Sequence, residues 1–157
     1  MFGKLDNTQI EQLLYSQLVG RIGCHANDMT YVLPVSYAYD GISVYVHTYE
    51  GMKMDMMRKN PTVCFQADKI EDYANWQSVV CWGTFEELVS ETDRMKACEI
   101  LNGRKLPVLT SDTMHLTTMW PFSAEKEEKP DGVFFRISLN KKTGRYEKIA
   151  SQDFFAT

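Results

Sequence analysis

The chain has 157 residues, of which 44% are hydrophobic and 24% are charged. This length predicts one domain over residues 1–157, and this composition excludes a disordered chain. The net charge of −4 lacks the basic excess of a nucleic-acid-binding domain, and no apolar run reaches the roughly 18 residues that cross a bilayer.

The first part of the chain is predicted to form a helix and then three strands. Thr8 and Glu11 match the capping box that begins a helix, ahead of apolar residues at helical spacing, and Gly20 ends this helix. Turn signals at Asn27-Asp28 and Asp40-Gly41 separate three short segments with strand patterns. These segments, which we expect to pair as a β-meander, are Arg21–Ala26, Tyr31–Tyr39 and Ile42–Thr48.

The remainder of the chain alternates between helical and strand patterns. Asn60-Pro61 ends a short helix, Gly83 marks a bend in a long strand, and Gly103 ends a second capped helix. The expected elements are the helix Glu50–Lys59, the strand Thr62–Ala67, the loop Asp68–Asn75, the strand Trp76–Val89, the helix Ser90–Asn102, the aperiodic connection Arg104–Pro130, the strand Val133–Leu139 and the turn Asn140–Arg145 around Gly144. Six strands with two or three helices predict a mainly β fold, a six-stranded antiparallel barrel with flanking helices.

Cysteine usage and the amino-terminal residues bear on the compartment. The four cysteines form no Cys-x-x-Cys pair and have no histidine at metal-ligand spacing, so we expect reduced thiols and no metal site. Residues 1–14 hold no apolar run followed by a cleavage site, which predicts a cytoplasmic protein without a signal peptide.

The junction between the strand ending at Thr48 and the following helix is a candidate anion site. Gly51 opens a turn there, and the free N–H groups of a helix start attract anions. Thr48 adds a hydroxyl and Lys53 adds an ammonium in the first helical turn. A phosphate monoester fits this set of donors, although many strand–glycine–helix junctions bind nothing.

Two further residues are candidates to contact a ligand. Pro34 lies within a strand pattern, and because proline cannot donate to a sheet ladder, it predicts an edge strand or an opening that could receive a flat ligand. His47 shares a strand face with Ser43 and Tyr45, opposite to Thr48. It is a candidate to face a substrate or a subunit interface, and the alternative is a hydrogen-bonded surface histidine.

The tryptophans are the remaining large candidates. Trp76 and Trp82 have the same strand parity, which predicts that both lie on one face of the sheet. Trp120 falls in the long connection, where it either covers a bound ring or anchors the connection to the core.

The run YVLPVSYAYDGISVYVHTYEGMKMDMMRKNPTVCFQAD resembles the flavin-binding split-barrel family related to pyridoxamine 5'-phosphate oxidase. The resemblance is greatest to its nitroimidazole-resistance-like branch, and it continues through WQSVVCWGTFEEL, MWPF and VFFRISLNKKTGR. It implies a six-stranded FMN-binding split barrel that forms a homodimer, with a flavin at each subunit interface. FAD or a deazaflavin is the alternative to FMN.

The resemblance also implies which residues surround the flavin. The strand positions Val32, Leu33, Pro34, Val35 and Ser36 match those along the isoalloxazine ring, His47, Thr48 and Lys53 match those near the phosphate, and Gln77, Ser78 and Val79 match a further part of the pocket. Trp120 is a candidate cover for the ring, and His47 is the candidate catalytic residue of the nitroimidazole-resistance-like branch.

The sequence differs from pyridoxamine 5'-phosphate oxidases at several positions, and these differences narrow the expected function. Tyr31 and Met52 stand where those oxidases carry arginines, and the chain lacks their carboxyl-terminal substrate motif. With fewer cations, either the phosphate is held more weakly or Arg21 or Arg58 replaces a missing cation, and Arg21 is the favoured replacement. We therefore expect an FMN-dependent oxidoreductase that reduces a small molecule such as a nitroaromatic, and not a pyridoxamine phosphate oxidase. The alternative is a non-catalytic flavin- or haem-binding carrier or sensor, for which His25, His47 and His115 are the candidate iron ligands.

Overall fold

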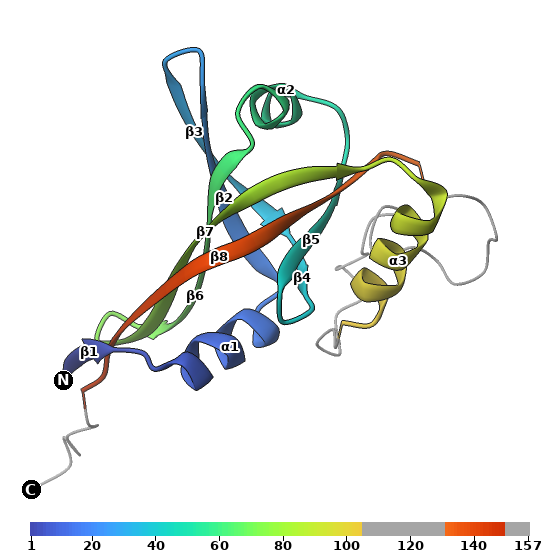
Figure 1. The fold of residues 1–157 in the computed structure, drawn as a ribbon. Helices are drawn as coiled ribbons and strands as arrows, with labels where there is room; N and C mark the ends of the chain where they lie inside the picture. The colour runs from blue at the N-terminus through green and yellow to red at the C-terminus, as the bar shows by residue number, and fades with distance from the viewer. Residues whose placement is uncertain (105–130, 150–157) are drawn as a thin grey trace, which may run out of the picture.

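The computed structural model describes residues 1–104 and 131–149, which form an antiparallel sheet with three helices around it (Figure 1). The elements in chain order are β1 (Phe2–Lys4), α1 (Asn7–Ser16), β2 (Val19–Ala26), β3 (Met29–Ser36), β4 (Ala38–Tyr39), β5 (Ser43–Thr48), α2 (Met52–Lys59), β6 (Thr62–Asp72), β7 (Asn75–Leu88), α3 (Glu91–Asn102) and β8 (Val133–Glu147). The mainly β antiparallel fold predicted from the sequence is confirmed.

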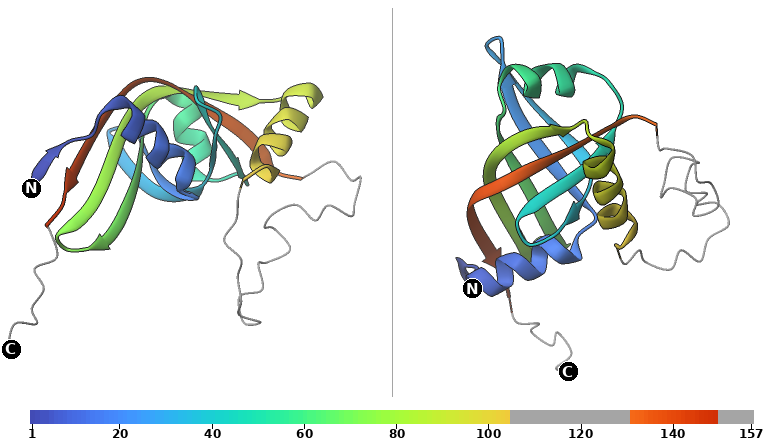
Figure 2. Two further views of the ribbon diagram at one scale, coloured as in Figure 1. Left: turned by 90° about the horizontal axis from the view of Figure 1, so that it is seen from below. Right: turned by 45° about the vertical axis from the view of Figure 1, so that its right-hand side comes forward.

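The sheet has eight strands in the order β3-β2-β6-β7-β8-β5-β4, with β1 added beside β8. Its first and last strands in this order, β3 and β4, are neighbours along the chain and are joined through Tyr37. The strands consequently wrap round an interior, as two further views show (Figure 2). The six strands expected from the sequence are all present, and the two additional strands are β1 and the short β4.

The predicted meander of the first three strands is wrong over most of its length. β3 pairs with β2, whereas β5 pairs with β8 and reaches the preceding segment only through the two residues of β4. The division occurs at Tyr37, whose ring is fully buried with its centroid 4.7 Å from that of Phe65. Its hydroxyl donates a hydrogen bond to the carbonyl of Leu14 at 2.8 Å. These distant contacts redirect the chain, and no local signal marks them.

The strands β6, β7 and β8 are longer than the sequence predicts. The expected loop over Asp68–Asn75 is a continuation of β6 and β7, which meet in a tight turn, and the expected turn around Gly144 lies inside β8. A Cβ atom at Gly144 would lie 2.7 Å from the Cβ of Leu5. This glycine therefore lets the segment before α1 pack closely on the strand, and does not mark a reversal of the chain.

The start of α1 also differs from its prediction. Asp6 caps the helix, because its Oδ1 accepts from the backbone N–H of Gln9 and the Gln9 Oε1 accepts from the N–H of Asp6, both at 2.9 Å. The capping box predicted at Thr8 and Glu11 is two residues late. Glu11 instead bonds to Tyr39 and Lys142, which fixes α1 across one end of the sheet.

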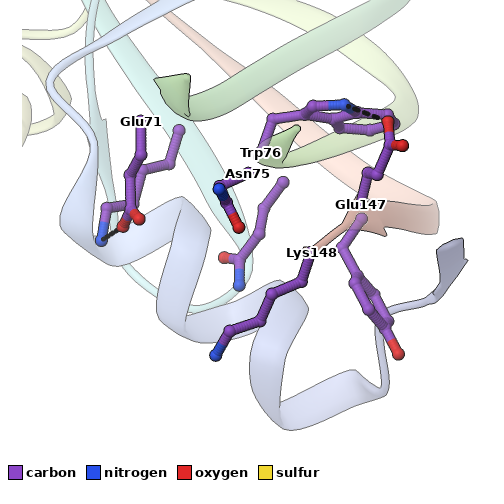
Figure 3. Close-up of a pocket in the computed structure, with 8 residues that line it drawn as sticks. Glu71, Asn75, Trp76, Glu147 and Lys148 are labelled. Carbon is purple, nitrogen blue, oxygen red and sulfur yellow. Dashed lines mark hydrogen bonds and ion pairs between the residues drawn. The ribbon is translucent and has the colours of Figure 1, made fainter. Parts of the chain in front are cut away.

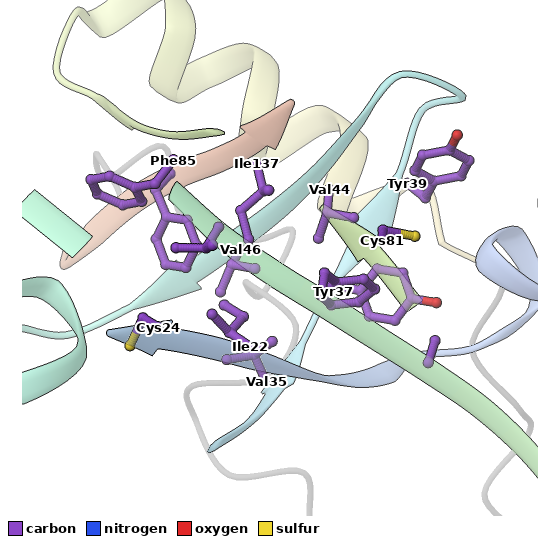
Figure 4. Packing of buried hydrophobic residues seen from close by; sticks show 14 of the residues in the cluster. Ile22, Cys24, Val35, Tyr37, Tyr39, Val44, Val46, Cys81, Phe85 and Ile137 are labelled. Carbon is purple, nitrogen blue, oxygen red and sulfur yellow. The ribbon is translucent and has the colours of Figure 1, made fainter. Parts of the chain in front are cut away.

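The interior of the wrapped sheet is filled by alternating residues of the strands (Figure 4). A second apolar cluster lies on the outside of β5 and β8, where α3 covers them through Ala97 and Leu101 against Tyr45 and Phe134. The two faces of β5 are thus both covered, so the side chains near its end lie in fixed surroundings. Within residues 1–104 and 131–149, no helix is long and apolar enough to span a bilayer.

Candidate functional site

The start of α2 has the features expected of an anion site. Gly51 is its N-cap residue and provides no side-chain hydrogen bond to the helix. A Cβ atom at Gly51 would meet no atom within 4 Å, so the space beside this residue is open. Lys53, in the first turn, is half-buried and forms no hydrogen bond or ion pair with any residue that the structure describes. An uncapped helix start beside an available ammonium can bind a phosphate monoester.

Arg58, one of the two arginines expected to supply a replacement cation, is already engaged. Its guanidinium donates to both carboxylate oxygens of Glu50, at 2.7 and 2.8 Å, and to both of Glu87, at 2.8 Å each. These hydrogen bonds lower the pKa of both carboxyl groups. Arg58 therefore neutralises Glu50 next to the helix start, and within the described part of the chain Lys53 is a cation of the first helical turn that remains for a ligand there.

The prediction of an edge strand at Pro34 is confirmed. β3 pairs with β2 along one side only, and Pro34 lies opposite Arg21 in that ladder. Leu33 and Val35 point into the interior, whereas Val32 is 64% exposed on the outer face with Pro34. The free side of this strand can accept a flat ligand along its backbone, as the sequence predicts.

The register of the sheet brings one predicted residue of β7 to the same outer face. Arg21 of β2 lies opposite Pro34 on one side and Gln66 on the other, and the Gln66 amide donates to the Ser78 hydroxyl at 3.0 Å. Arg21 itself pairs with Asp68 at 2.9 Å, so the second arginine proposed as a substitute is also engaged. Ser78 can consequently contribute to a ligand site on this face.

The neighbours of Ser78 point elsewhere. Val79 is fully buried in the interior, so its side chain cannot reach a ligand on the outer face. Gln77 lines a shallow pocket of about 100 Å³ at the far end of β6, β7 and β8 (Figure 3). The Trp76 indole N–H donates to Glu147 at 3.1 Å beside that pocket, and Lys69 and Glu71 are ion-paired at 3.0 Å. Of the three predicted β7 residues, only Ser78 has a side chain on the face with Pro34.

His47 lies at the end of β5 in mostly enclosed surroundings. Its Nε2 is 2.5 Å from the backbone carbonyl of Asp131, and its ring centroid is 4.6 Å from that of Phe134. Burial lowers its pKa, which keeps the imidazole neutral at pH 7. A Cβ atom at Gly132 would lie 2.7 Å from this Nε2 and 2.6 Å from the Thr48 carbonyl, so the start of β8 closely covers both residues. His47 is hydrogen-bonded, as one of its two interpretations expects, but it is half-buried and not a surface residue, and its catalytic role stays a prediction.

Three other candidates have different outcomes. His25 forms a hydrogen bond with the Thr30 hydroxyl at 2.9 Å, in keeping with a structural role. Trp120 and His115 lie outside the described residues, so the predicted cover for a bound ring is not placed.

Arg104 is a neighbour of the predicted site that the sequence does not indicate. It follows α3, and its guanidinium donates to the Ser36 hydroxyl at 2.9 Å and to the Tyr37 carbonyl at 2.8 Å. Burial lowers its pKa to about 10, which still leaves it charged at pH 7. The only local signal was a cation directly after the helix-ending Gly103, within a segment expected to be a connection.

The chain is similar to known proteins over most of its length. The family model described as pyridoxamine 5'-phosphate oxidase matches residues 6–145. An uncharacterized protein of Rhizobium meliloti is 28% identical over 131 residues, covering 81% of this chain and 83% of that protein. An FAD-binding protein of Mesorhizobium loti is 27% identical in its solved structure, with a TM-score of 0.71 over 94% of this chain and 99% of that chain.

A further solved structure bears on the fold alone. It is a protein of Bacteroides thetaiotaomicron provisionally described as a 5-nitroimidazole antibiotic resistance protein, 17% identical, with a TM-score of 0.67 over 93% of this chain and 87% of that chain. The family match extends from the cap of α1 to the last part of β8 and so includes every element of the candidate site. The chain therefore belongs to the pyridoxamine 5'-phosphate oxidase family, as its sequence resemblance predicts.

Proposed function

We propose that this protein binds a flavin with its phosphate at the start of α2 and its ring along the free edge of β3, and that it uses the flavin to reduce a small molecule. The observation that carries the proposal is the uncapped helix start at Gly51 with Lys53 beside it. The FAD-binding relative from Mesorhizobium loti gives independent support for a flavin. FMN is the simplest ligand that combines a flat tricyclic ring with a phosphate monoester.

The residues present fit such a ligand at each of its parts. The open space at Gly51 accommodates phosphate oxygens, and Lys53 supplies a charge-assisted hydrogen bond. Pro34 removes one backbone donor from β3, and the exposed Val32 offers an apolar contact. The Arg104 guanidinium, held at Ser36, places a half-buried positive charge at the end of this strand.

Each of these groups has a definable task. A bound flavin supplies two-electron oxidation–reduction chemistry, while the protein binds, orients and electrostatically tunes it. Lys53 and the N–H groups of α2 bind the phosphate. The edge of β3 orients the ring, and Arg104 favours additional negative charge nearby. His47, neutral at pH 7 and bonded to the Asp131 carbonyl, positions the end of β5 next to Thr48.

We propose further that two copies of the chain assemble on the outer face of β2, β3 and β7. The sheet register places Val32, Gly23, Cys64 and Trp82 in one row across this face. Val32 is 64% exposed and Trp82 is 39% exposed, which is a large apolar area for a surface that meets only water. A second copy would cover it and would enclose a ring bound at the edge of β3.

The decisive experiment is an absorbance scan of the purified protein, with mass identification of any chromophore released on denaturation. We expect flavin absorption, a stoichiometry near one flavin per chain after reconstitution with FMN or FAD, and a dimer by light scattering. A colourless protein that takes up neither flavin would refute the proposed function. Flavin binding without NADH- or NADPH-dependent reduction of a nitroaromatic acceptor would favour a carrier or sensor over a reductase.

A further inference from the structure

A groove lies between α2 and the turn that joins β2 to β3, two elements that Figure 1 shows side by side. It has a volume of about 220 Å³. Ala26, Asn27 and Met29 line it from the turn, and Met52, Asp55, Met56 and Lys59 line it from α2. The four α2 residues recur at helical spacing and therefore share one side of the helix. Because Met52 directly follows Gly51, the groove begins at the proposed phosphate site.

The groove is held open by a fixed framework. Asn27 and Asp28 both have positive φ, 51° and 59°, which is the geometry of a tight hairpin turn. The side-chain amide of Asn60 donates to the His25 carbonyl at 2.9 Å and so ties the end of α2 to β2. The distance between the two walls is thus set by the backbone and does not depend on a ligand.

The lining combines an apolar base with polar groups at its rim. Met56 is buried, whereas Met29 and Met52 are 51% and 48% exposed, which is unusual for two adjacent thioethers. Methionine sulfur makes favourable contacts with aromatic rings. Asn27 and Lys59 form no hydrogen bond or ion pair with any described residue, and the Asp55 carboxylate is 4.0 Å from Arg58. The groove therefore offers an amide, an ammonium and a carboxylate around a site for a flat ring.

We infer that this groove binds the adenosine half of FAD, an inference that rests on the proposed flavin function. The adenine ring lies against Met29 and Met52, and the Asn27 amide can pair with the donor and acceptor edge of adenine. Asp55 accepts hydrogen bonds from ribose hydroxyls, a common use of a carboxylate in nucleotide sites. Lys53, in the first turn of α2, provides positive charge for the diphosphate, whereas Lys59 lies in the last turn at the other end of the groove. FMN, which lacks the adenosine half, leaves the groove empty.

The test compares FAD, FMN and riboflavin binding by calorimetry in the full chain and in two groove variants. Met52→Ser removes an exposed thioether, and Asn27→Gly removes the amide while tolerating the positive φ. We expect wild type to bind FAD at least tenfold more tightly than FMN, and the double variant to lose most of that preference while keeping its FMN and riboflavin affinities. Met95→Ser, which changes another exposed methionine on α3, is the matched control and should alter none of the three affinities.

A second measurement locates the adenosine directly. In protein labelled at the methionine methyl groups, the NMR signals of Met29 and Met52 should shift on adding FAD and stay in place on adding FMN. Equal FAD and FMN affinities in wild type, or methyl signals that shift only as the protein self-associates, would overturn the groove and leave the flavin site at α2 intact. Failure to bind any flavin would instead refute the proposed function, and the groove with it.

Discussion

The change Lys53→Ala tests the proposed phosphate site most directly. Lys53 is half-buried and makes no hydrogen bond or ion pair with a described residue, so its removal leaves no carboxylate unpaired there. A charge-assisted hydrogen bond contributes about 1.5–3 kcal/mol, and solvent screening of a half-exposed ammonium favours the lower half of that range. Since 1.4 kcal/mol corresponds to tenfold in affinity, FMN binding should weaken by about 10–40-fold.

Riboflavin provides the internal comparison, because it carries the same ring without the phosphate. Its affinity should change less than twofold in Lys53→Ala, and the melting temperature of the protein without ligand should be unchanged. Titration of each ligand, followed by quenching of flavin fluorescence, gives both affinities. Lys96→Ala, which removes an exposed lysine of α3, is the control. Equal losses for FMN and riboflavin, or no loss for FMN, would show that Lys53 does not bind the phosphate.

Three further predictions concern stability. Gly83→Ala should lower the free energy of unfolding by about 1–3 kcal/mol in urea titrations, because the new Cβ would lie 2.4 Å from the Ser138 carbonyl oxygen. Gly51→Ala has open space and extended backbone, so it should leave the free energy of unfolding unchanged while weakening FMN binding. A larger loss of stability in Gly51→Ala than in Gly83→Ala would contradict this. Arg58→Met should lower the melting temperature at pH 7 and by much less at pH 3. The low pKa of Glu87 in the folded state gives stability above its unfolded pKa of about 4.3, which is lost as pH falls through the folded value. A difference that stays constant across this pH range would contradict that explanation.

Local sequence signals were sufficient to predict the structure where one residue type determines the backbone conformation or its hydrogen bonding. Pro34 cannot donate to a ladder and so required an edge, and Asn27-Asp28 supplied the positive φ of the β2–β3 turn. The register parity of Ile22 and Cys24, which both point inward, also followed from alternation alone. These features depend on steric limits and hydrogen-bonding groups within a few residues, which the sequence states directly.

The long ribbon of β6, β7 and β8 could not be predicted in the same way. The segment from Asp68 to Asn75 is as polar as a loop, yet it continues a local hairpin in which Asp68 lies opposite Ser78. The start of β7 in this hairpin is paired on its other side by the distant end of β8. Gly144 has the local pattern of a turn, yet its missing side chain is needed for Leu5, which lies far away in the sequence. In both cases a contact with a distant segment extends or controls what the local pattern suggests.

For the candidate site, the sequence by itself determined the family, the edge strand and the chemistry available at Thr48, Gly51 and Lys53. Only the tertiary structure decided which of the candidate residues can act together. In the folded chain Arg58 is paired with Glu50 and Glu87, and the Val79 side chain points into the interior. Arg104, from a distant part of the chain, is hydrogen-bonded to Ser36. The physical reason is that residue type fixes what a group can bind, whereas the register of the sheet and the packing of helices fix which groups remain free to bind it.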